Sequence, residues 1–281
     1  MRFIFLAVAL LGIIPSAARA QADERVIYTS VVDRDGAPVL DLGIKDFIVR
    51  EDGQAREILS VARDNDPLQI ALLVDNSVSM RPRLSILRKA VAAFIDSTRE
   101  DVQIALITLA ERPTILVGYT TDRAALRKAA ENMFAYEAAN YLLDGIAETS
   151  QGLAKRTMWR SAIAVITGIG PEMSYRQYTE VLRFFRAGGA SLNVVQLGSG
   201  IGEQGREIVV SKGTSETGGR FEEVLVPTGL ELKSRQLATE LSNQYRVTYA
   251  RPNRLVPPSK TEVSVRRTDL RARGMLLKTE K

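Results

Sequence analysis

The stretch "LLVDNSVSMRP", residues 72–82, ends an apolar run at an aspartate and then places two serines at alternate positions. The run begins at Leu68 and is almost wholly apolar, which is typical of a parallel strand covered on both faces. Asp75 ends this strand, and Ser77 and Ser79 fall in the loop before the next helix. In open parallel sheets, ligands bind at the carboxyl ends of strands. The stretch therefore predicts an α/β fold with a polar site at one sheet edge.

The pattern around this stretch alternates strands with helices. Apolar runs predict strands at 68–74, 102–109, 114–118, 161–167, 191–197 and, shortest of all, within 215–224. Helical spacing predicts helices at 82–98, 122–134, 141–154, 175–187 and 203–210, with a closing helix along Leu230, Leu237 and Leu241. The alternation implies a doubly wound, mostly parallel six-stranded sheet with helices on both faces.

The two flanks have a different period. Residues 24–62 alternate as β-strands, with a hairpin turn at Asp52-Gly53, and the tail after residue 243 alternates again. A lone two-stranded ribbon is marginal in water, so we expect both flanks to form one small β-sandwich. The expected division is a leader at 1–20, a β segment at 21–66, the α/β domain at 67–243 and a second β segment at 244–281.

The first twenty residues predict export. Arg2 precedes an apolar core at 3–14, and Pro15 and an Ala-Arg-Ala end at Ala20 follow. This is typical of a cleaved signal peptide; the alternative, an uncleaved anchor, is disfavoured because the core is short for a span. No later segment is apolar enough to cross a bilayer, so we expect a periplasmic or secreted protein.

Composition excludes several chemistries. The 281 residues include no histidine and no cysteine, which rules out Ser-His-Asp and Cys-His catalysis and thiolate metal sites. The formal charge of +5 falls to +3 without Arg2 and Arg19 (36 basic and 33 acidic residues remain). That small excess is spread along the chain, so we expect no nucleic-acid binding.

The oxygen atoms of Asp75, Ser77 and Ser79 allow two interpretations. A carboxylate and two hydroxyls are hard ligands that suit Mg²⁺ or Mn²⁺. Alternatively, Asp75 accepts backbone hydrogen bonds and the serines cap the helix, with no ion involved.

The motif Asp-x-Ser-x-Ser at 75–79 resembles the metal-ion-dependent adhesion site of von Willebrand factor type A domains. The resemblance extends through "GYTTDRAAL" at 118–126, "NVVQLGSG" at 193–200 and "TGGRF" at 217–221, and thus covers about residues 67–243. The flanks "VVDRDGAPVLDLGIKDFIVREDG" and "QYRVTYARP" resemble an exported bacterial subgroup with a β module. The resemblance implies a protein partner whose carboxylate completes the metal shell.

The sequence departs from this family at two expected ligands. Alignment on "LLDGI" places Asn140 where the family has threonine, and "AVITGIGP" places Gly168 where it has a second aspartate. Asn140 is a possible ligand, whereas glycine supplies none. Glu111 and Glu172, on loops at the same edge, are weaker candidates to restore the missing charge.

Other motifs have simpler interpretations. The Gly-x-Gly-x-x-Gly at 200–205, with Glu222 downstream, follows a late strand and is better explained as a loop than as a dinucleotide site. Trp159 is interpreted as a packing residue, and Glu222-Glu223 as a solvated edge.

We therefore expect a non-catalytic adhesion-type module that binds a protein at the edge formed by Asp75, Ser77, Ser79, Asn140 and Gly168. The alternative is a structural scaffold or envelope assembly component that acts through its β module without metal. The sequence names neither the partner nor the oligomeric state.

Overall fold

A computed structural model describes the chain except for residues 1–21, 157–159, 201, 253–257, 259 and 277–281. The expected leader at 1–20 and Trp159 lie outside the described residues. Among the helices that are described, none has the length and apolar character needed to cross a membrane.

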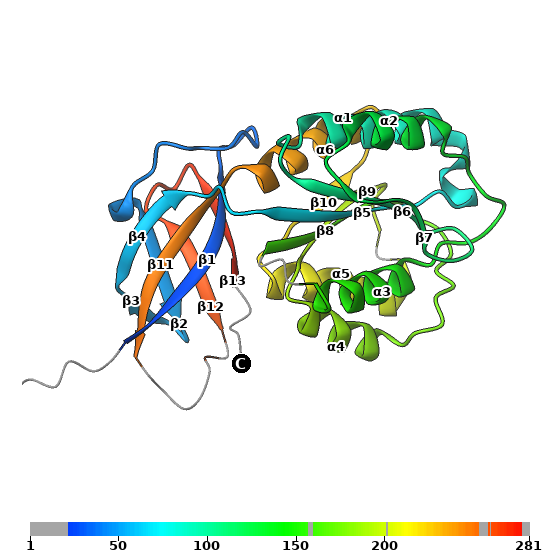
Figure 1. Cartoon of the computed structure of the whole chain (residues 1–281). Coiled ribbons are helices and arrows are strands. Elements are labelled where there is room, and N and C mark those ends of the chain that lie inside the picture. Colours follow the sequence, from blue (N-terminus) through cyan, green and yellow to red (C-terminus); the bar gives the residue numbers. More distant parts are fainter. Residues whose placement is uncertain (1–21, 157–159, 201, 253–257, 259, 277–281) are drawn as a thin grey trace, which may run out of the picture.

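The α/β fold is confirmed, and its centre is a six-stranded sheet (Figure 1). Its strands are β5 (Leu68–Val74), β6 (Gln103–Thr108), β7 (Thr114–Thr120), β8 (Arg160–Gly168), β9 (Ser191–Leu197) and β10 (Phe221–Val224). Their order is β10-β9-β8-β5-β6-β7, and every neighbouring pair is parallel except β6 with β7. The strand that ends at Asp75 is therefore interior, between β8 and β6.

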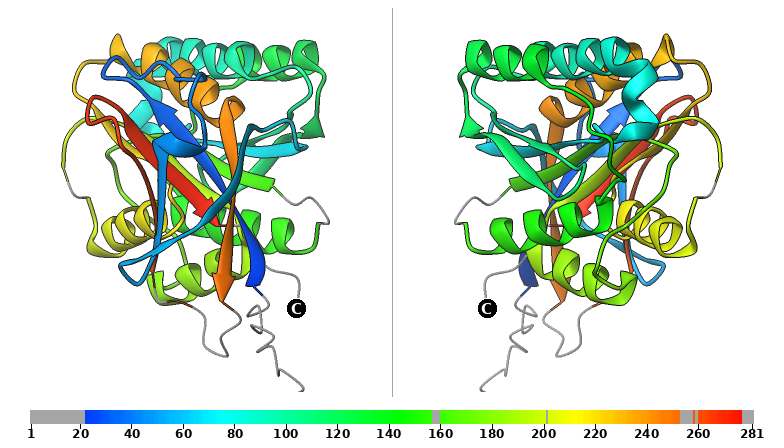
Figure 2. Two further views of the ribbon diagram at one scale, coloured as in Figure 1. Left: turned by 90° about the vertical axis from the view of Figure 1, so that its left-hand side faces the viewer. Right: turned by 90° about the vertical axis from the view of Figure 1, so that its right-hand side faces the viewer.

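Helices cover both faces of this sheet, as both views in Figure 2 show. One layer holds α1 (Leu84–Ser97), α2 (Arg123–Asn132) and α6 (Gly229–Ser242); the other holds α3 (Leu142–Ala154), α4 (Tyr178–Gly188) and α5 (Gln204–Glu216). Side chains of β5 alternate between the two apolar cores: Leu72 packs toward the first layer and Leu73 toward the second. Burial on both faces explains why this strand is apolar throughout.

Two predicted helices begin later than expected. A 3-10 helix at Val78–Arg83, which contains Pro82, precedes α1, so the α-helix begins at Leu84 and not at residue 82. The helix predicted from residue 175 begins at Tyr178. The backbone N–H groups of Tyr175 and Arg176 donate instead to the carboxylate of Asp144, which holds this segment as a loop.

The flanks form two antiparallel sheets. One has the order β13-β1-β11-β4 and the other β12-β2-β3. Their strands are β1 (Ala22–Val32), β2 (Phe47–Glu51), β3 (Gln54–Arg56), β4 (Ile58–Arg63), β11 (Gln244–Pro252), β12 (Thr261–Val265) and β13 (Arg271–Leu276). The first and last parts of the chain thus pair with each other, as β1 does with β11. The sheets share one apolar cluster, in which the rings of Phe47 and Tyr245 lie 5.1 Å apart. The division of the chain at residues 67 and 243 stays a prediction.

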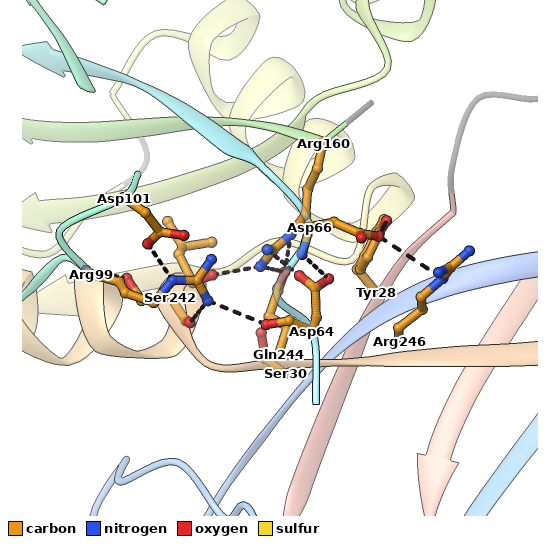
Figure 3. A network of polar contacts seen from close by, with 11 residues as sticks. Tyr28, Ser30, Asp64, Asp66, Arg99, Asp101, Arg160, Ser242, Gln244 and Arg246 are labelled. Atoms are coloured by element: carbon orange, nitrogen blue, oxygen red, sulfur yellow. Dashed lines mark hydrogen bonds and ion pairs between the residues drawn. The ribbon is translucent and has the colours of Figure 1, made fainter. Parts of the chain in front are cut away.

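A buried polar network joins the six-stranded sheet to the antiparallel sheets (Figure 3). Arg160, at the start of β8, donates from Nη2 to Gln244 Oε1 at 2.6 Å and to the carbonyl of Leu241 at 2.8 Å. It also pairs with Asp64 and lies 5.1 Å from the ring centroid of Tyr28. The network sits at the amino ends of the parallel strands, so their carboxyl ends lie at the opposite end of the sheet.

Candidate functional site at the carboxyl edge of the sheet

Three neighbouring strands place polar side chains at their carboxyl ends. Asp75 follows β5, Thr167 is the penultimate residue of β8, and Gln196 is the penultimate residue of β9. All three are buried. Because the strands are parallel neighbours, these side chains converge at one edge.

Protein donors surround the carboxylate of Asp75. Oδ1 accepts the backbone N–H of Ser77 at 3.0 Å. Oδ2 accepts three hydrogen bonds, from the Thr167 hydroxyl at 2.9 Å and from Asn140 Nδ2 and the Gly168 N–H at 3.1 Å each. Such bonds fix the orientation of the carboxylate.

The serine hydroxyls lie side by side, with Ser77 Oγ 2.8 Å from Ser79 Oγ. Ser77 is buried, whereas Ser79 is partly exposed. No side-chain cap hydrogen bond is made by Ser77 at the start of the 3-10 helix. The prediction that this serine caps the helix through its side chain is therefore wrong; its backbone N–H instead bonds Asp75.

The sequence predicts that Asp75, Ser77 and Asn140 form part of an exposed binding face. The structure corrects this prediction, because all three residues are buried, with at most 2% of each exposed. The segment at 134–140 covers them. Its Ala138 carbonyl accepts the N–H of Val78, and the Tyr136 N–H donates to the carbonyl of Asn76, both at 2.9 Å. Only Ser79 of the predicted oxygen ligands reaches the surface.

Asn140 and Gly168 also adjoin the carboxylate of Asp75. Asn140 directs its amide nitrogen toward Asp75, and its Oδ1 atom is buried without a hydrogen-bond partner in the described part of the chain. A Cβ atom placed on Gly168 would lie 2.4 Å from the sulfur of Met80. The position where the family has an aspartate is thus occupied by the Met80 side chain.

Arg206, on α5, is a residue of this site that the sequence analysis did not identify. Its Nη2 atom donates to the Gly168 carbonyl at 2.8 Å, to Gln196 Oε1 at 3.0 Å and to the Thr167 hydroxyl at 3.2 Å. The side chain is buried. Burial lowers the pKa of Arg206, and the nearby carboxylates of Glu172 and Asp75 oppose that effect. The sequence does show polar residues at the carboxyl ends of β5, β8 and β9, and these indicate a polar site that a buried charged side chain could join.

The two acidic candidates do not supply a second free carboxylate. Glu172 is buried and accepts hydrogen bonds from the Ser174 hydroxyl at 2.5 Å and from the N–H of Leu142 at 3.3 Å, at the start of α3. Burial raises the pKa of Glu172. Glu111 is exposed, in a left-handed turn with φ of 63°.

As folded, these residues do not fit a divalent cation. Asp75 is the one carboxylate of the predicted set, both of its oxygens accept protein hydrogen bonds, and a buried guanidinium lies close by. Affinity of oxygen-ligand sites rises with the number of charged ligands. Among the described residues, no group of three or more acidic, histidine or cysteine side chains is placed to hold a metal. The donor set thus argues against the predicted magnesium or manganese site, and cation titration tests this.

The glycine-rich segment at 200–205 leads into α5, and Gly200 and Gly202 have positive φ of 137° and 62°. Glu222, which a dinucleotide site would need for a ribose, instead pairs with Arg220 at 2.8 Å and Lys233 at 2.6 Å. Arg206 lies in the first turn of α5, directly after this segment in the sequence.

A pocket of about 200 Å³ opens beside Ser79. It is lined by Ser79, Met80, Arg83, Gly168, Ile169, Leu197, Gly198, Leu225 and Pro227. Two of its apolar residues are exposed, Ile169 at 38% and Leu225 at 71%. Exposed apolar side chains, a hydroxyl and a guanidinium thus lie together at this edge.

Comparison with known proteins gives one family match. Residues 70–171 match the family described as von Willebrand factor type A domain. A search of curated proteins found no match.

Solved structures share the fold at low sequence identity. A von Willebrand factor type A protein from Catenulispora acidiphila is 9% identical with a TM-score of 0.52, and the match covers 92% of this chain and 72% of that one. Proximal thread matrix protein 1 from the mussel byssus is 13% identical with a TM-score of 0.52, over 69% of this chain and 50% of that one. Another structure of that mussel protein, described as having a zinc-occupied MIDAS motif, is 16% identical with a TM-score of 0.50, over 68% and 49% of the two chains.

Proposed function

We propose that this chain, whose residues 70–171 match the von Willebrand factor type A domain family, is an exported, non-catalytic module that binds a protein partner at the carboxyl edge of its six-stranded sheet. Domains of this family commonly mediate protein–protein interactions. The leader-like first twenty residues support export. The absence of histidine and cysteine from the sequence supports a non-catalytic role.

The observation that carries the proposal is the pocket beside Ser79. Its apolar residues Ile169 and Leu225 are exposed, as are two valines next to lining residues in the sequence: Val226, which follows Leu225 and is 60% exposed, and Val78, which precedes Ser79 and is 40% exposed. Exposed apolar side chains gathered beside a pocket are typical of protein-binding surfaces. The partner would place an apolar side chain there.

The charge of this pocket favours an acidic group on the partner. Arg83 is exposed, and within the described residues its side chain makes no ion pair or hydrogen bond. The Ser79 hydroxyl is the second polar group of the pocket. A guanidinium and a hydroxyl together suit a carboxylate. The partner segment would therefore carry Asp, Glu or a C-terminal carboxylate next to its apolar side chain.

The alternative is a scaffold that acts through the antiparallel sheets. The antiparallel sheets adjoin the amino ends of the parallel strands (Figure 1), whereas the pocket is lined by residues at the carboxyl ends of β8, β9 and β10, so the two surfaces can be altered separately. Leu59, on β4, is 41% exposed and provides a matched position on the antiparallel sheets.

The test compares three variants in affinity capture from native envelope extract, with bound proteins identified by mass spectrometry. Leu225→Asp and Arg83→Glu alter the pocket, and Leu59→Asp makes the same apolar-to-acidic change on β4. We expect both pocket variants to lose a protein that the parent and Leu59→Asp retain. Loss with Leu59→Asp alone would support the scaffold, and equal capture by all variants would contradict a partner at either surface. Circular dichroism confirms that each variant is folded.

A further inference from the structure

The guanidinium of Arg206 is bound to the same elements that hold Asp75. Its Nη2 atom contacts the carbonyl of Gly168 at 2.8 Å and the hydroxyl of Thr167 at 3.2 Å, while Asp75 Oδ2 accepts from that hydroxyl at 2.9 Å and from the Gly168 N–H at 3.1 Å. The Thr167 hydroxyl therefore donates to the carboxylate and accepts from the guanidinium. One threonine oxygen links the negative group to the positive one.

The charges at this edge are balanced by the chain itself. Arg206 is 3% exposed and Asp75 is 0% exposed, so solvation by water does little to stabilise either charge. A buried charge is strongly unfavourable unless another charge or several dipoles compensate it. The Nη1 atom of Arg206 is buried without a hydrogen-bond partner in the described chain, and a cation placed beside it would be repelled by the guanidinium.

Packing closes the same space. Met80 is 1% exposed, and its sulfur lies where a side chain at residue 168 would begin. At Gly170, a Cβ atom would come within 2.7 Å of the Ser79 hydroxyl oxygen. A side chain at residue 168 or 170 would therefore have to displace Met80 or Ser79.

We infer that the Arg206 guanidinium is the permanent counter-charge of Asp75 and takes the electrostatic place of a divalent cation at this edge. The site is then held in one state at any concentration of Mg²⁺ or Mn²⁺. Insensitivity of partner binding to a chelator follows from this inference only if the proposed function also holds. Cation binding and unfolding test Arg206 without any partner.

The experiment measures thermal unfolding and isothermal titration with MgCl₂ or MnCl₂ alone. The parent is expected to give no heat of binding and no change in Tm with either salt or with EDTA. Arg206→Gln removes the positive charge and leaves the oxygens of Asp75, Ser77, Ser79 and Asn140. We expect it to lower Tm by about 5 °C or more, because several buried hydrogen bonds are lost, and we expect Mn²⁺ to restore part of that loss.

Arg220 provides the matched control. It is a buried arginine, paired with Glu240 at 2.9 Å, on the segment before β10. Arg220→Gln is expected to lower Tm without any response to Mn²⁺. If Arg206→Gln does not fold, Arg206→Lys replaces it, since lysine keeps the positive charge. We expect Arg206→Lys to have a lower Tm than the parent, with no change in Tm when Mg²⁺ or Mn²⁺ is added. A saturable rise in the Tm of the parent with Mg²⁺, or an unchanged Tm in Arg206→Gln or Arg206→Lys, would overturn the inference.

Discussion

The guanidinium of Arg160 pairs with the carboxylate of Asp64 where the six-stranded sheet meets the antiparallel sheets, and neither side chain is exposed (Figure 3). Arg160 is the first residue of β8, and Asp64 is the first residue of the connection from β4 to β5. This contact is one of several that join the antiparallel sheets to the six-stranded sheet. Removing one member of a buried ion pair destabilises a protein far more than replacing both members by apolar residues, because a single remaining charge is left uncompensated.

Arg160→Met should therefore destabilise the protein by about 3–5 kcal/mol, because it leaves Asp64 buried without its partner. The double variant Arg160→Met with Asp64→Leu should recover a large part of this loss, since no uncompensated charge remains. Urea unfolding of the two single variants and the double variant gives the coupling energy. Additive effects would show that the pair itself contributes little.

The stability of Arg160→Met should also depend on pH more steeply than that of the parent. Burial raises the pKa of Asp64 above its ordinary value of 3.8, and Arg160 opposes this rise. Without Arg160 the folded-state pKa rises further. A raised carboxyl pKa contributes stability below pH 3.8 that is lost as the pH increases through the folded-state pKa. Unfolding midpoints at a series of pH values measure this loss, and adding Asp64→Asn to Arg160→Met should abolish the extra dependence.

Thr167→Val removes the hydroxyl between Arg206 and Asp75 while keeping the shape of the side chain. We expect a loss of about 1–3 kcal/mol, because a buried carboxylate and a buried guanidinium each lose a partner. Thr108→Val is the control, since this buried threonine ends β6 and makes one long contact of 3.5 Å to the Thr114 carbonyl. Chemical denaturation of both variants makes the comparison, and equal losses would argue against a special role for Thr167.

Gly168→Ala should destabilise by about 1–3 kcal/mol through overpacking, because the new Cβ would lie 2.4 Å from the Met80 sulfur. Met80→Ala in the same chain should relieve part of that cost, so the double variant should be more stable than the sum of the single effects predicts. Gly152→Ala, in α3 with nothing within 4 Å of the new Cβ, should instead stabilise by roughly 0.5–1 kcal/mol. Thermal unfolding distinguishes these outcomes; a neutral Gly168→Ala would show that Met80 moves aside freely.

The sequence was most informative where a local pattern has a single physical explanation. The apolar run of β5 is buried on both faces, and the change from apolar residues to Asp75 marks the end of the strand. The sequence also predicts the turn at Asp52-Gly53. Both residues have positive φ, a conformation that Asp-Gly adopts more readily than most other pairs. The pairing of the first and last strands was inferred because neither flank can bury an apolar face alone.

Helix starts and the state of the site depended on distant residues. The helix at α4 begins at Tyr178 because Asp144, on α3, binds the backbone ahead of it, which no local pattern reports. Asp75 is covered by a loop from 134–140, so a side chain expected at the surface is buried.

By itself, the sequence determined the order of strands and helices, the sheet edge where polar side chains gather and the absence of histidine and cysteine chemistry. Only the tertiary structure shows which positively charged side chain lies near Asp75. Arg206 lies on a different helix far along the chain, and it reaches the carboxylate's neighbours because β5, β8 and β9 are adjacent in the sheet. Residue spacing encodes local periodicity, whereas charge pairing depends on which strands lie side by side.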